Sequence, residues 1–218
     1  MTGTPRIVEV RRNILKRNDE IAHSLRCRFQ EAAILAVSLV SSPGAGKTAF
    51  LEKTLTILGA SSRPAALVGD LATDNDAVRL ARSRAKVKQI TTGAVCHLEA
   101  AMVEEALRDW NLAELDYLFV ENVGNLVCPS SWDLGEDFRV VLLSVTEGED
   151  KPLKYPTIFN TSDVAIISKI DLAEAVEFDR DVALANIHAV RPGMPVFELS
   201  AKTGQGIDGW ISFLKARR

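Results

Sequence analysis

Beyond residue 33, short apolar runs alternate with longer stretches in which apolar residues recur at helical spacing. The runs predict strands at Leu35–Val40, Ala65–Val68, Val87–Thr91, Tyr117–Glu121, Arg139–Val145, Val164–Ser168 and Val196–Glu198. The longer stretches predict helices at Lys47–Leu58, Asp74–Ala85, Leu98–Asp109, Ala173–Val190 and Gly206–Ala216. Because several runs are apolar at consecutive positions, both faces of their sheet should be covered, as in a mainly parallel sheet. The pattern predicts a three-layer α/β fold.

Residues 1–30 follow a different pattern. They form a helical apolar stripe with an excess of basic residues around it. The stripe consists of Ile7, Ile14 and Ile21, joined by Leu15, Ala22 and Leu25. It predicts an N-terminal amphipathic helix that packs on the domain behind it, and a partner-docking arm is the alternative.

Composition narrows the class of protein. The chain has 218 residues, of which 47% are hydrophobic and 25% charged, as in ordinary globular proteins, so disordered and collagen-like chains are excluded. The net charge of −3 gives no basic field for nucleic acid or anionic lipid. No apolar run is long enough to span a bilayer, and Met1–Lys16 lacks the apolar core of a signal peptide. We expect a cytoplasmic protein without nucleic-acid or membrane partners.

The octapeptide Ser41–Thr48 carries the strongest chemical signal. It follows a predicted strand, opens a predicted helix and matches the P-loop pattern Gly-x-x-x-x-Gly-Lys-Ser/Thr, except that serine takes the first position. Gly44 and Gly46 leave backbone N–H groups free to surround phosphate oxygens. Lys47 would reach the β- and γ-phosphates, and the Thr48 hydroxyl would bind Mg²⁺. The predicted phosphate-binding residues are Pro43, Gly44, Ala45, Gly46, Lys47, Thr48 and Ala49.

Two later elements predict the base. Ser168–Asp171 ends an apolar strand and resembles the Asn/Thr-Lys-x-Asp element of GTPases, with serine in the first place. The Asp171 carboxylate can accept from N1–H and the amino group of guanine, whereas adenine offers an acceptor at N1, and the Lys169 stem can cover the base. Ser200–Lys202 follows another strand and resembles the Ser-Ala-Lys element that touches guanine O6. The predicted base-binding residues are Lys169, Asp171, Ser200, Ala201 and Lys202, so we assign residues 31–218 to a P-loop GTPase domain.

The expected hydrolysis residues depart from the usual GTPase pattern. Glu121–Gly124 stands where most GTPases carry Asp-x-x-Gly, beside the P-loop strand. Glu121 can hold Mg²⁺ directly or through water, and the Gly124 N–H can sense the γ-phosphate. In the acidic cluster Gly69–Asp76, Asp70 is the preferred metal-facing carboxylate because it ends a strand next to the phosphates, whereas Asp74 is weighed as a helix N-cap. We find no glutamine that would position water, so we expect slow hydrolysis. The catalytic assignments are Lys47, Thr48, Asp70 and Glu121, with Thr48, Asp70 and Glu121 as magnesium ligands.

Cys96, His97 and Cys128 are candidate ligands of a second metal. Cys96 precedes a predicted helix, whose N-terminus should lower the pKa of the thiol, and Cys128 lies four residues beyond Gly124. The alternative is that the cysteines are small buried residues and His97 is a surface imidazole. Three ligands leave a four-coordinate metal incomplete, so two copies of the chain would complete it. Lys154, in the charged segment 147–155, is assigned to the phosphates of the same or the facing subunit, or that segment is a solvated loop.

Five segments together resemble the HypB family, the GTPases that assist nickel insertion into nickel–iron hydrogenase. They are Ser41–Thr48, Gly69–Asp76, Thr92–His97, Glu121–Pro129 and Thr146–Pro156, and the resemblance covers nearly the whole chain from residue 5. Glu121–Pro129 (ENVGNLVCP) and the Cys-His pair are much more specific than the P-loop.

The resemblance implies a Mg²⁺-dependent GTPase that binds GTP and GDP and acts as a nickel metallochaperone. It implies a nucleotide-dependent homodimer whose interface holds Ni²⁺ or Zn²⁺ on Cys96, His97 and Cys128. A partner metallochaperone and the hydrogenase large subunit are the implied partners. The Cys-x-x-Cys-Gly-Cys site and His-rich tract of some members are missing here, so nickel storage is not implied.

Three alternatives remain at this point. One is an accessory GTPase for another metalloenzyme, of the urease type, although a Cys-Pro-His triplet would have been expected there. Another is a GTP-tuned metal-binding protein with negligible turnover. A small-molecule kinase on a P-loop scaffold is disfavoured, because base-reading elements are present and a lid-like arginine cluster is not.

Overall fold

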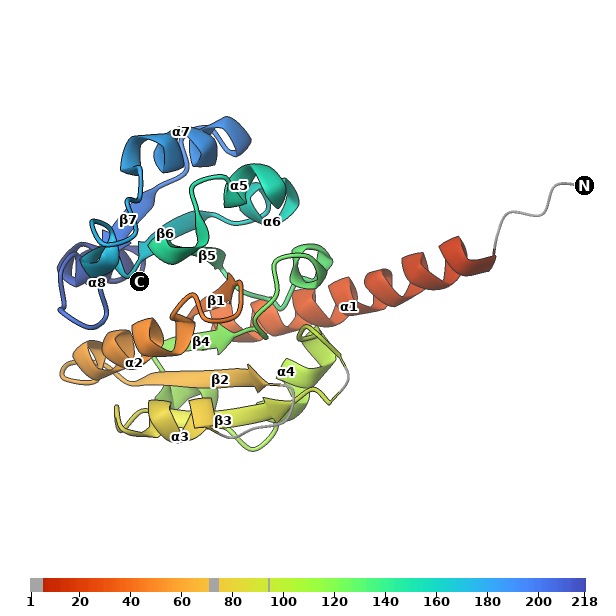
Figure 1. Ribbon diagram of the computed structural model, residues 1–218. Helices are drawn as coiled ribbons and strands as arrows, with labels where there is room; N and C mark the ends of the chain where they lie inside the picture. The colour runs from red at the N-terminus through yellow and green to blue at the C-terminus, as the bar shows by residue number, and fades with distance from the viewer. Residues whose placement is uncertain (1–5, 71–74, 94) are drawn as a thin grey trace, which may run out of the picture.

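A seven-stranded parallel sheet forms the centre of the protein in the computed structural model, which describes residues 6–70, 75–93 and 95–218 (Figure 1). In the first helix the side chains are described from Arg12 onward. The strands are β1 (Leu35–Ser41), β2 (Pro64–Asp70), β3 (Lys86–Thr91), β4 (Tyr117–Glu121), β5 (Phe138–Ser144), β6 (Val164–Ser168) and β7 (Val196–Leu199). Their order is β3-β2-β4-β1-β5-β6-β7, and each paired neighbour runs parallel. The predicted mainly parallel sheet is confirmed.

Helices cover both faces of this sheet, which completes the predicted three layers. They are α1 (Arg6–Glu31), α2 (Lys47–Leu58), α3 (Asn75–Ala81), α4 (Ala100–Ala106), α5 (Lys151–Lys154), α6 (Pro156–Asn160), α7 (Arg180–Val190) and α8 (Ile207–Arg217). Side chains of α2, α3 and α8 form the core on one face. Those of α1 and α4, and of α6 and α7, form two cores on the other. Among the described residues, none of the helices combines the length and apolarity that a bilayer crossing requires.

The alternation of side chains along β1 assigns its residues to the two faces. Val37 and Leu39 pack with α2 and α8, whereas Ala36 packs with α1 and α4, and Val40 with α6 and α7. Every residue of β1 is therefore buried, which explains its continuous apolar sequence. Burial on both faces also fixes the end of β1 firmly, and the P-loop begins there.

Among the described side chains of α1, the buried ones begin at Asn18 and continue through the second half of the helix. Ala22, Leu25 and Phe29 are buried against α4 and the nearby strands, whereas Ile14 is 48% exposed. Figure 1 shows the N-terminal half extending away from the body as a single long helix. The predicted packing of the apolar stripe is therefore wrong at Ile14, whose side chain is exposed, and the side chain of Ile7 lies outside the described residues.

Three helices are shorter than predicted. α3 ends at Ala81 rather than Ala85, and Arg84 adopts a left-handed φ of 64°. α4 spans Ala100–Ala106 rather than Leu98–Asp109. α7 begins at Arg180 rather than Ala173. The spacing of apolar residues overestimates helix length here, because the turns that flank these helices also place apolar side chains in the core.

The start of α7 and the segment 147–155 also differ from the sequence-based prediction. The side chain of Asp179 accepts a hydrogen bond from the Val182 N–H, so Asp179 is the N-cap of α7. The segment 147–155, weighed as a solvated loop, contains α5. Asp74, weighed as an N-cap, lies outside the described residues.

Candidate functional site

The P-loop joins the end of β1 to the start of α2. Gly44 and Gly46 have φ values of 76° and 93°, in the left-handed region that glycine adopts without strain. Lys47 is 7% exposed, and its Nζ donates to Ser41 Oγ at 2.9 Å. Burial lowers the pKa of this lysine, although the nearby Glu121 carboxylate opposes that shift. Gly46 provides no side-chain cap for α2, so the first N–H groups of the helix are oriented as an anion site requires.

Glu121 lies beside this loop because β4 pairs directly with β1. The Thr48 hydroxyl donates to Glu121 Oε1 at 2.8 Å, and the carboxylate is 2% exposed. Burial raises the pKa of Glu121 to about 7, with Lys47 and Thr48 opposing the rise. Oε2 has no hydrogen-bond partner among the described residues. A buried carboxylate oxygen without a partner, next to a P-loop threonine, fits a divalent cation.

Asp70 closes β2, which is separated from β1 by β4. Asp70 ends a strand as expected, with β4 lying between β2 and the P-loop strand β1, and its role as a Mg²⁺ ligand stays a prediction. Its main-chain oxygen accepts from the N–H of Thr92, at the start of the segment that leads to Cys96.

The predicted base-binding residues meet around one cavity. Its volume is about 230 Å³, and it is lined by Gly46, Ala49, Phe50, Ser168, Lys169, Asp171, Leu172, Leu199, Ser200, Ala201 and Lys202. The Ser168 hydroxyl donates to the main-chain oxygen of Ala45 at 2.7 Å, so the shorter serine still ties this strand end to the P-loop. Lys169 has a φ of 59°, and its Nζ donates to the main-chain oxygen of Gly44.

Gly124 brings the segment after β4 against the P-loop. A Cβ on Gly124 would lie 2.9 Å from Pro43 Cα, so glycine is required for this close approach. Lys154 forms an exposed ion pair with Asp150 within α5, while Lys151 lies over the ring of Tyr155, and the assignment of Lys154 to the phosphates stays a prediction. Among the described contacts, none joins Lys154 to the P-loop of its own subunit.

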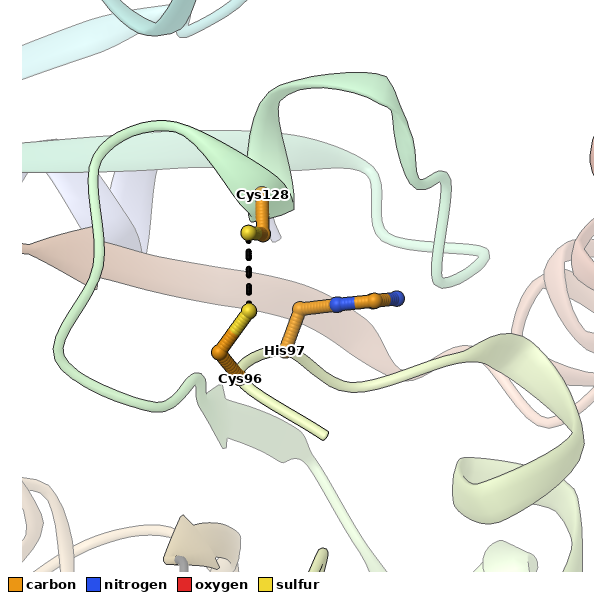
Figure 2. A group of neighbouring side chains, drawn as sticks. All are labelled: Cys96, His97 and Cys128. Atoms are coloured by element: carbon orange, nitrogen blue, oxygen red, sulfur yellow. Dashed lines mark hydrogen bonds between the residues drawn. The ribbon is translucent and has the colours of Figure 1, made fainter. Parts of the chain in front are cut away.

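Cys96, His97 and Cys128 come together at the other end of this segment. Their ligand atoms all lie within 4.8 Å of one another, and each residue is half-buried. Figure 2 shows the two cysteine sulfurs facing each other, with Cys128 on the short helical turn Cys128–Ser131. The distance between the sulfurs is 2.8 Å. Two facing thiols beside an imidazole form a donor set suited to nickel or zinc.

The electrostatics of this cluster differ from the prediction in one respect. Because the Cys96 thiol bonds with Cys128, the pKa of Cys96 is raised rather than lowered. The predicted lowering assumed a helix N-terminus at this position, but α4 begins only at Ala100. A metal would be needed to hold both sulfurs as thiolates.

His97 is not a surface imidazole. Its side chain is 13% exposed, and neither ring nitrogen has a hydrogen-bond partner among the described residues. The ring lies against Trp132, with centroids 4.4 Å apart, and burial lowers the pKa of the imidazole. Nε2 lies 3.7 Å from the Glu99 carboxylate, which is beyond hydrogen-bond distance. A neutral imidazole with a nitrogen free of hydrogen bonds is the form that binds a metal.

Two asparagines after β4 connect the nucleotide and metal ends of the site. Asn122 is buried and accepts from the Leu98 N–H at 3.0 Å. Asn125 donates to the main-chain oxygen of Cys96 at 3.3 Å and accepts from the Val127 N–H at 2.8 Å. The sequence analysis did not assign these asparagines or Trp132 to the site. Their position in the segment 121–132, among predicted site residues, is the feature that could have identified them.

Comparisons with known proteins identify the family to which the chain belongs. The family described as CobW/HypB/UreG, nucleotide-binding domain, matches residues 35–198. Hydrogenase maturation factor HypB from Escherichia coli K12 is 42% identical over 213 residues, which cover 98% of this chain and 73% of the relative. Hydrogenase/urease maturation factor HypB from Helicobacter pylori 26695 is 40% identical, with coverage of 97% and 88%.

Solved structures give the same result. A crystal structure of HypB from Helicobacter pylori in complex with nickel matches with a TM-score of 0.87 and 40% identity, covering 92% of this chain and 94% of that one. HypB from Archaeoglobus fulgidus matches with a TM-score of 0.86 and 38% identity, with coverage of 92% and 98%. The signal recognition particle 54 kDa protein from Aeropyrum pernix K1, in complex with GDP, has a TM-score of 0.60 but 16% identity, over 77% of this chain and 42% of that one, so it supports the fold alone.

Proposed function

The chain belongs to the CobW/HypB/UreG family, within its HypB group, and on that premise we propose that it is a Mg²⁺-dependent GTPase acting as a nickel metallochaperone in hydrogenase maturation. One observation carries the proposal. A single short segment begins at Glu121, beside the P-loop, and ends at Cys128, beside Cys96 and His97. The two sites are therefore linked through the chain itself.

The nucleotide half of the proposal rests on three groups of residues. The P-loop and Lys47 would hold the phosphates, and Thr48, Glu121 and Asp70 would hold Mg²⁺. The cavity beside Asp171 would take guanine. When bound, Mg²⁺ would neutralise charge on the phosphates. The proposed turnover is slow, since the sequence shows no glutamine equivalent to the water-positioning residue of other GTPases.

The proposed nickel site rests on the three ligands that one chain supplies and on the fourth ligand that it lacks. The two thiols and His97 supply three ligands, which leaves a four-coordinate ion unsatisfied. A second copy of the chain would complete it, so we propose a nucleotide-dependent homodimer with Ni²⁺, or Zn²⁺ in its place, at the interface. Nickel is favoured because the H. pylori HypB structure was solved in complex with it. A partner metallochaperone and the hydrogenase large subunit are the proposed donor and acceptor of the cargo.

Coupling between the two halves follows from their contacts. A γ-phosphate that draws in the Gly124 N–H would move the segment in which Asn125 holds Cys96 and the N–H of Val127. Hydrolysis would reverse this movement and lower the affinity for the cargo metal. By linkage, metal binding should change nucleotide affinity by the same factor.

The deciding experiment is nickel titration of the purified chain with GDP and with a non-hydrolysable GTP analogue. We expect a different nickel affinity and a different dimer fraction in the two states. Single-turnover GTP hydrolysis with and without nickel is measured on the same samples. Equal nickel affinities in both states would refute the metallochaperone cycle, while detectable metal binding without any hydrolysis would favour the GTP-tuned metal-binding protein.

One observation favours a second client. The Helicobacter relatives are called hydrogenase/urease maturation factors. A role in urease maturation is tested by adding the nickel-loaded chain to metal-free urease and to the metal-free hydrogenase large subunit. Activation of urease alone would identify urease, rather than hydrogenase, as the enzyme that receives nickel.

A further inference from the structure

Asn18 is a buried polar residue at the point where α1 leaves the body of the protein. It is 5% exposed. Its Nδ2 donates to the main-chain oxygen of Asp133 at 2.8 Å, and its Oδ1 accepts from the Ala100 N–H at 2.8 Å. These partners fix the orientation of the amide, because a carbonyl can only accept and an N–H can only donate.

The two partners of Asn18 belong to the two segments that carry the metal ligands. Ala100 lies three residues after His97 and begins α4. Asp133 lies five residues after Cys128 and directly follows Trp132, whose ring packs on His97. One side chain from a helix far away in the sequence therefore bridges both segments.

The rest of α1 contacts the protein on both sides of this bridge. On one side its apolar residues pack on α4, and Arg28 forms a long ion pair with Glu104 at 3.9 Å. The contacts on the other side are shorter. Arg26 pairs with the Asp133 carboxylate at 2.7 Å, and a Cβ on Gly135 would lie 2.8 Å from the main-chain oxygen of Ala22. The segment after Cys128 is thus seated closely on α1. Among the described residues, Asn18 alone bonds from α1 to both ligand-bearing segments.

We infer that Asn18 is a positioning residue for the metal site: it fixes the spacing between the Cys96–His97 segment and the Cys128 segment, and so raises metal affinity without binding the metal. The inference rests on the proposed nickel-binding function. A purely structural role, in which Asn18 only satisfies the start of α4, is the competing explanation, because Glu99 supplies no side-chain cap there.

Two variants separate these explanations. Asn18→Asp keeps an oxygen for the Ala100 N–H but loses the donor to Asp133, so it releases one segment while α4 stays capped. Asn18→Ala loses both bonds. Asn13→Ala, an exposed asparagine of the same helix, is the matched control, and Phe29→Leu controls for lost stability because Phe29 is buried in α1 away from these bonds.

The first readout is nickel titration followed by thiolate-to-nickel absorption, with GDP affinity and urea unfolding measured in parallel. We expect Asn18→Asp to lower nickel affinity roughly tenfold and to alter the absorption spectrum, as loss of a supporting hydrogen bond does at metal sites. GDP affinity should be unchanged. Asn13→Ala should match the parent, and Phe29→Leu should lose stability while keeping its nickel affinity.

The second readout needs no nickel. Phenylarsine oxide bridges two thiols only when they lie close together, so mass spectrometry of the metal-free chain reports the spacing of Cys96 and Cys128. We expect the fraction bridged to fall severalfold in both Asn18 variants. Parental bridging and parental nickel affinity in Asn18→Asp would overturn the inference, as would an equal loss in Phe29→Leu. If the arsenical bridges the two cysteines of the parent protein but the parent binds no nickel, the proposed function is refuted. The positioning role of Asn18 is then decided by the bridging assay alone.

Discussion

The buried Glu121 carboxylate makes the stability of the metal-free protein depend on pH. Burial raises its pKa from 4.5 to about 7 in the folded state. The stability contributed by this protonated carboxyl is therefore fully present below pH 4.5 and is lost as the pH rises through about 7. A shift of this size corresponds to about 3 kcal/mol of unfolding free energy, at about 1.4 kcal/mol for each pKa unit.

Replacement of Glu121 by glutamine removes the titrating group while keeping an acceptor for the Thr48 hydroxyl. In EDTA, urea unfolding of the parent should show a free energy that falls between pH 5 and pH 8. In Glu121→Gln this fall should be smaller by up to about 3 kcal/mol. The full value is an upper limit, because the variant also leaves the buried Lys47 without its partner charge. Glu147→Gln, which also removes a negative charge near Lys47, should keep the parental slope.

Magnesium provides an independent test of the same carboxylate. Because a protonated carboxyl does not bind the cation, Mg²⁺ affinity in the GDP complex should weaken as the pH falls from 8 to 6. The variant should bind Mg²⁺ weakly at every pH in that range. Equal pH slopes of unfolding in the parent and in Glu121→Gln would show that the pKa of this carboxylate is not raised by folding. The argument that burial prepares Glu121 to bind a cation would then be refuted.

Three further outcomes are expected. Lys47→Ala should lower single-turnover GTP hydrolysis by at least about 100-fold, because its charge stabilises the phosphates; activity within about twofold of the parent would contradict the P-loop assignment. Asp171→Asn should shift binding preference from GTP toward XTP in a competition assay, since xanthine presents a carbonyl where guanine presents its amino group; unchanged preference for GTP would contradict the base assignment. Cys128→Ala should weaken nickel binding at least tenfold and remove most of its nucleotide dependence in a titration, while GDP affinity stays parental; a retained nucleotide dependence would make Cys128 a packing residue.

The elements that the sequence predicted well are those set by local pattern. The strands were found because burial on both faces leaves continuous apolar runs, as in β1. The P-loop was found because its glycines and Lys47 occupy fixed positions between a strand and a helix. Ser168 shows the limit of such matching: the sequence identifies it as a departure from the usual asparagine or threonine, and only the structure shows that its hydroxyl bonds to the main-chain oxygen of Ala45.

Features set by distant contacts were not predictable. The start of α4 is an example, because the Ala100 N–H bonds to Asn18, and no local pattern predicts that contact. Asn18 itself lies in an amphipathic helix, and nothing in the sequence of that helix distinguishes it from the other polar residues. The pKa of Cys96 was mispredicted for a related reason, since its thiol meets Cys128 only once the sheet has formed.

The coupling proposed between nucleotide and metal requires only a small structural change. The segment from Glu121 to Cys128 holds the metal end through single hydrogen bonds: the Leu98 N–H donates to Asn122, and Asn125 donates to the main-chain oxygen of Cys96. One such bond contributes about 0.5–1.5 kcal/mol. A tenfold change in metal affinity requires about 1.4 kcal/mol. If γ-phosphate binding at Gly124 makes or breaks one or two of these bonds, the metal site changes affinity by the factor that loading and release of a cargo ion require, without any rearrangement of the sheet.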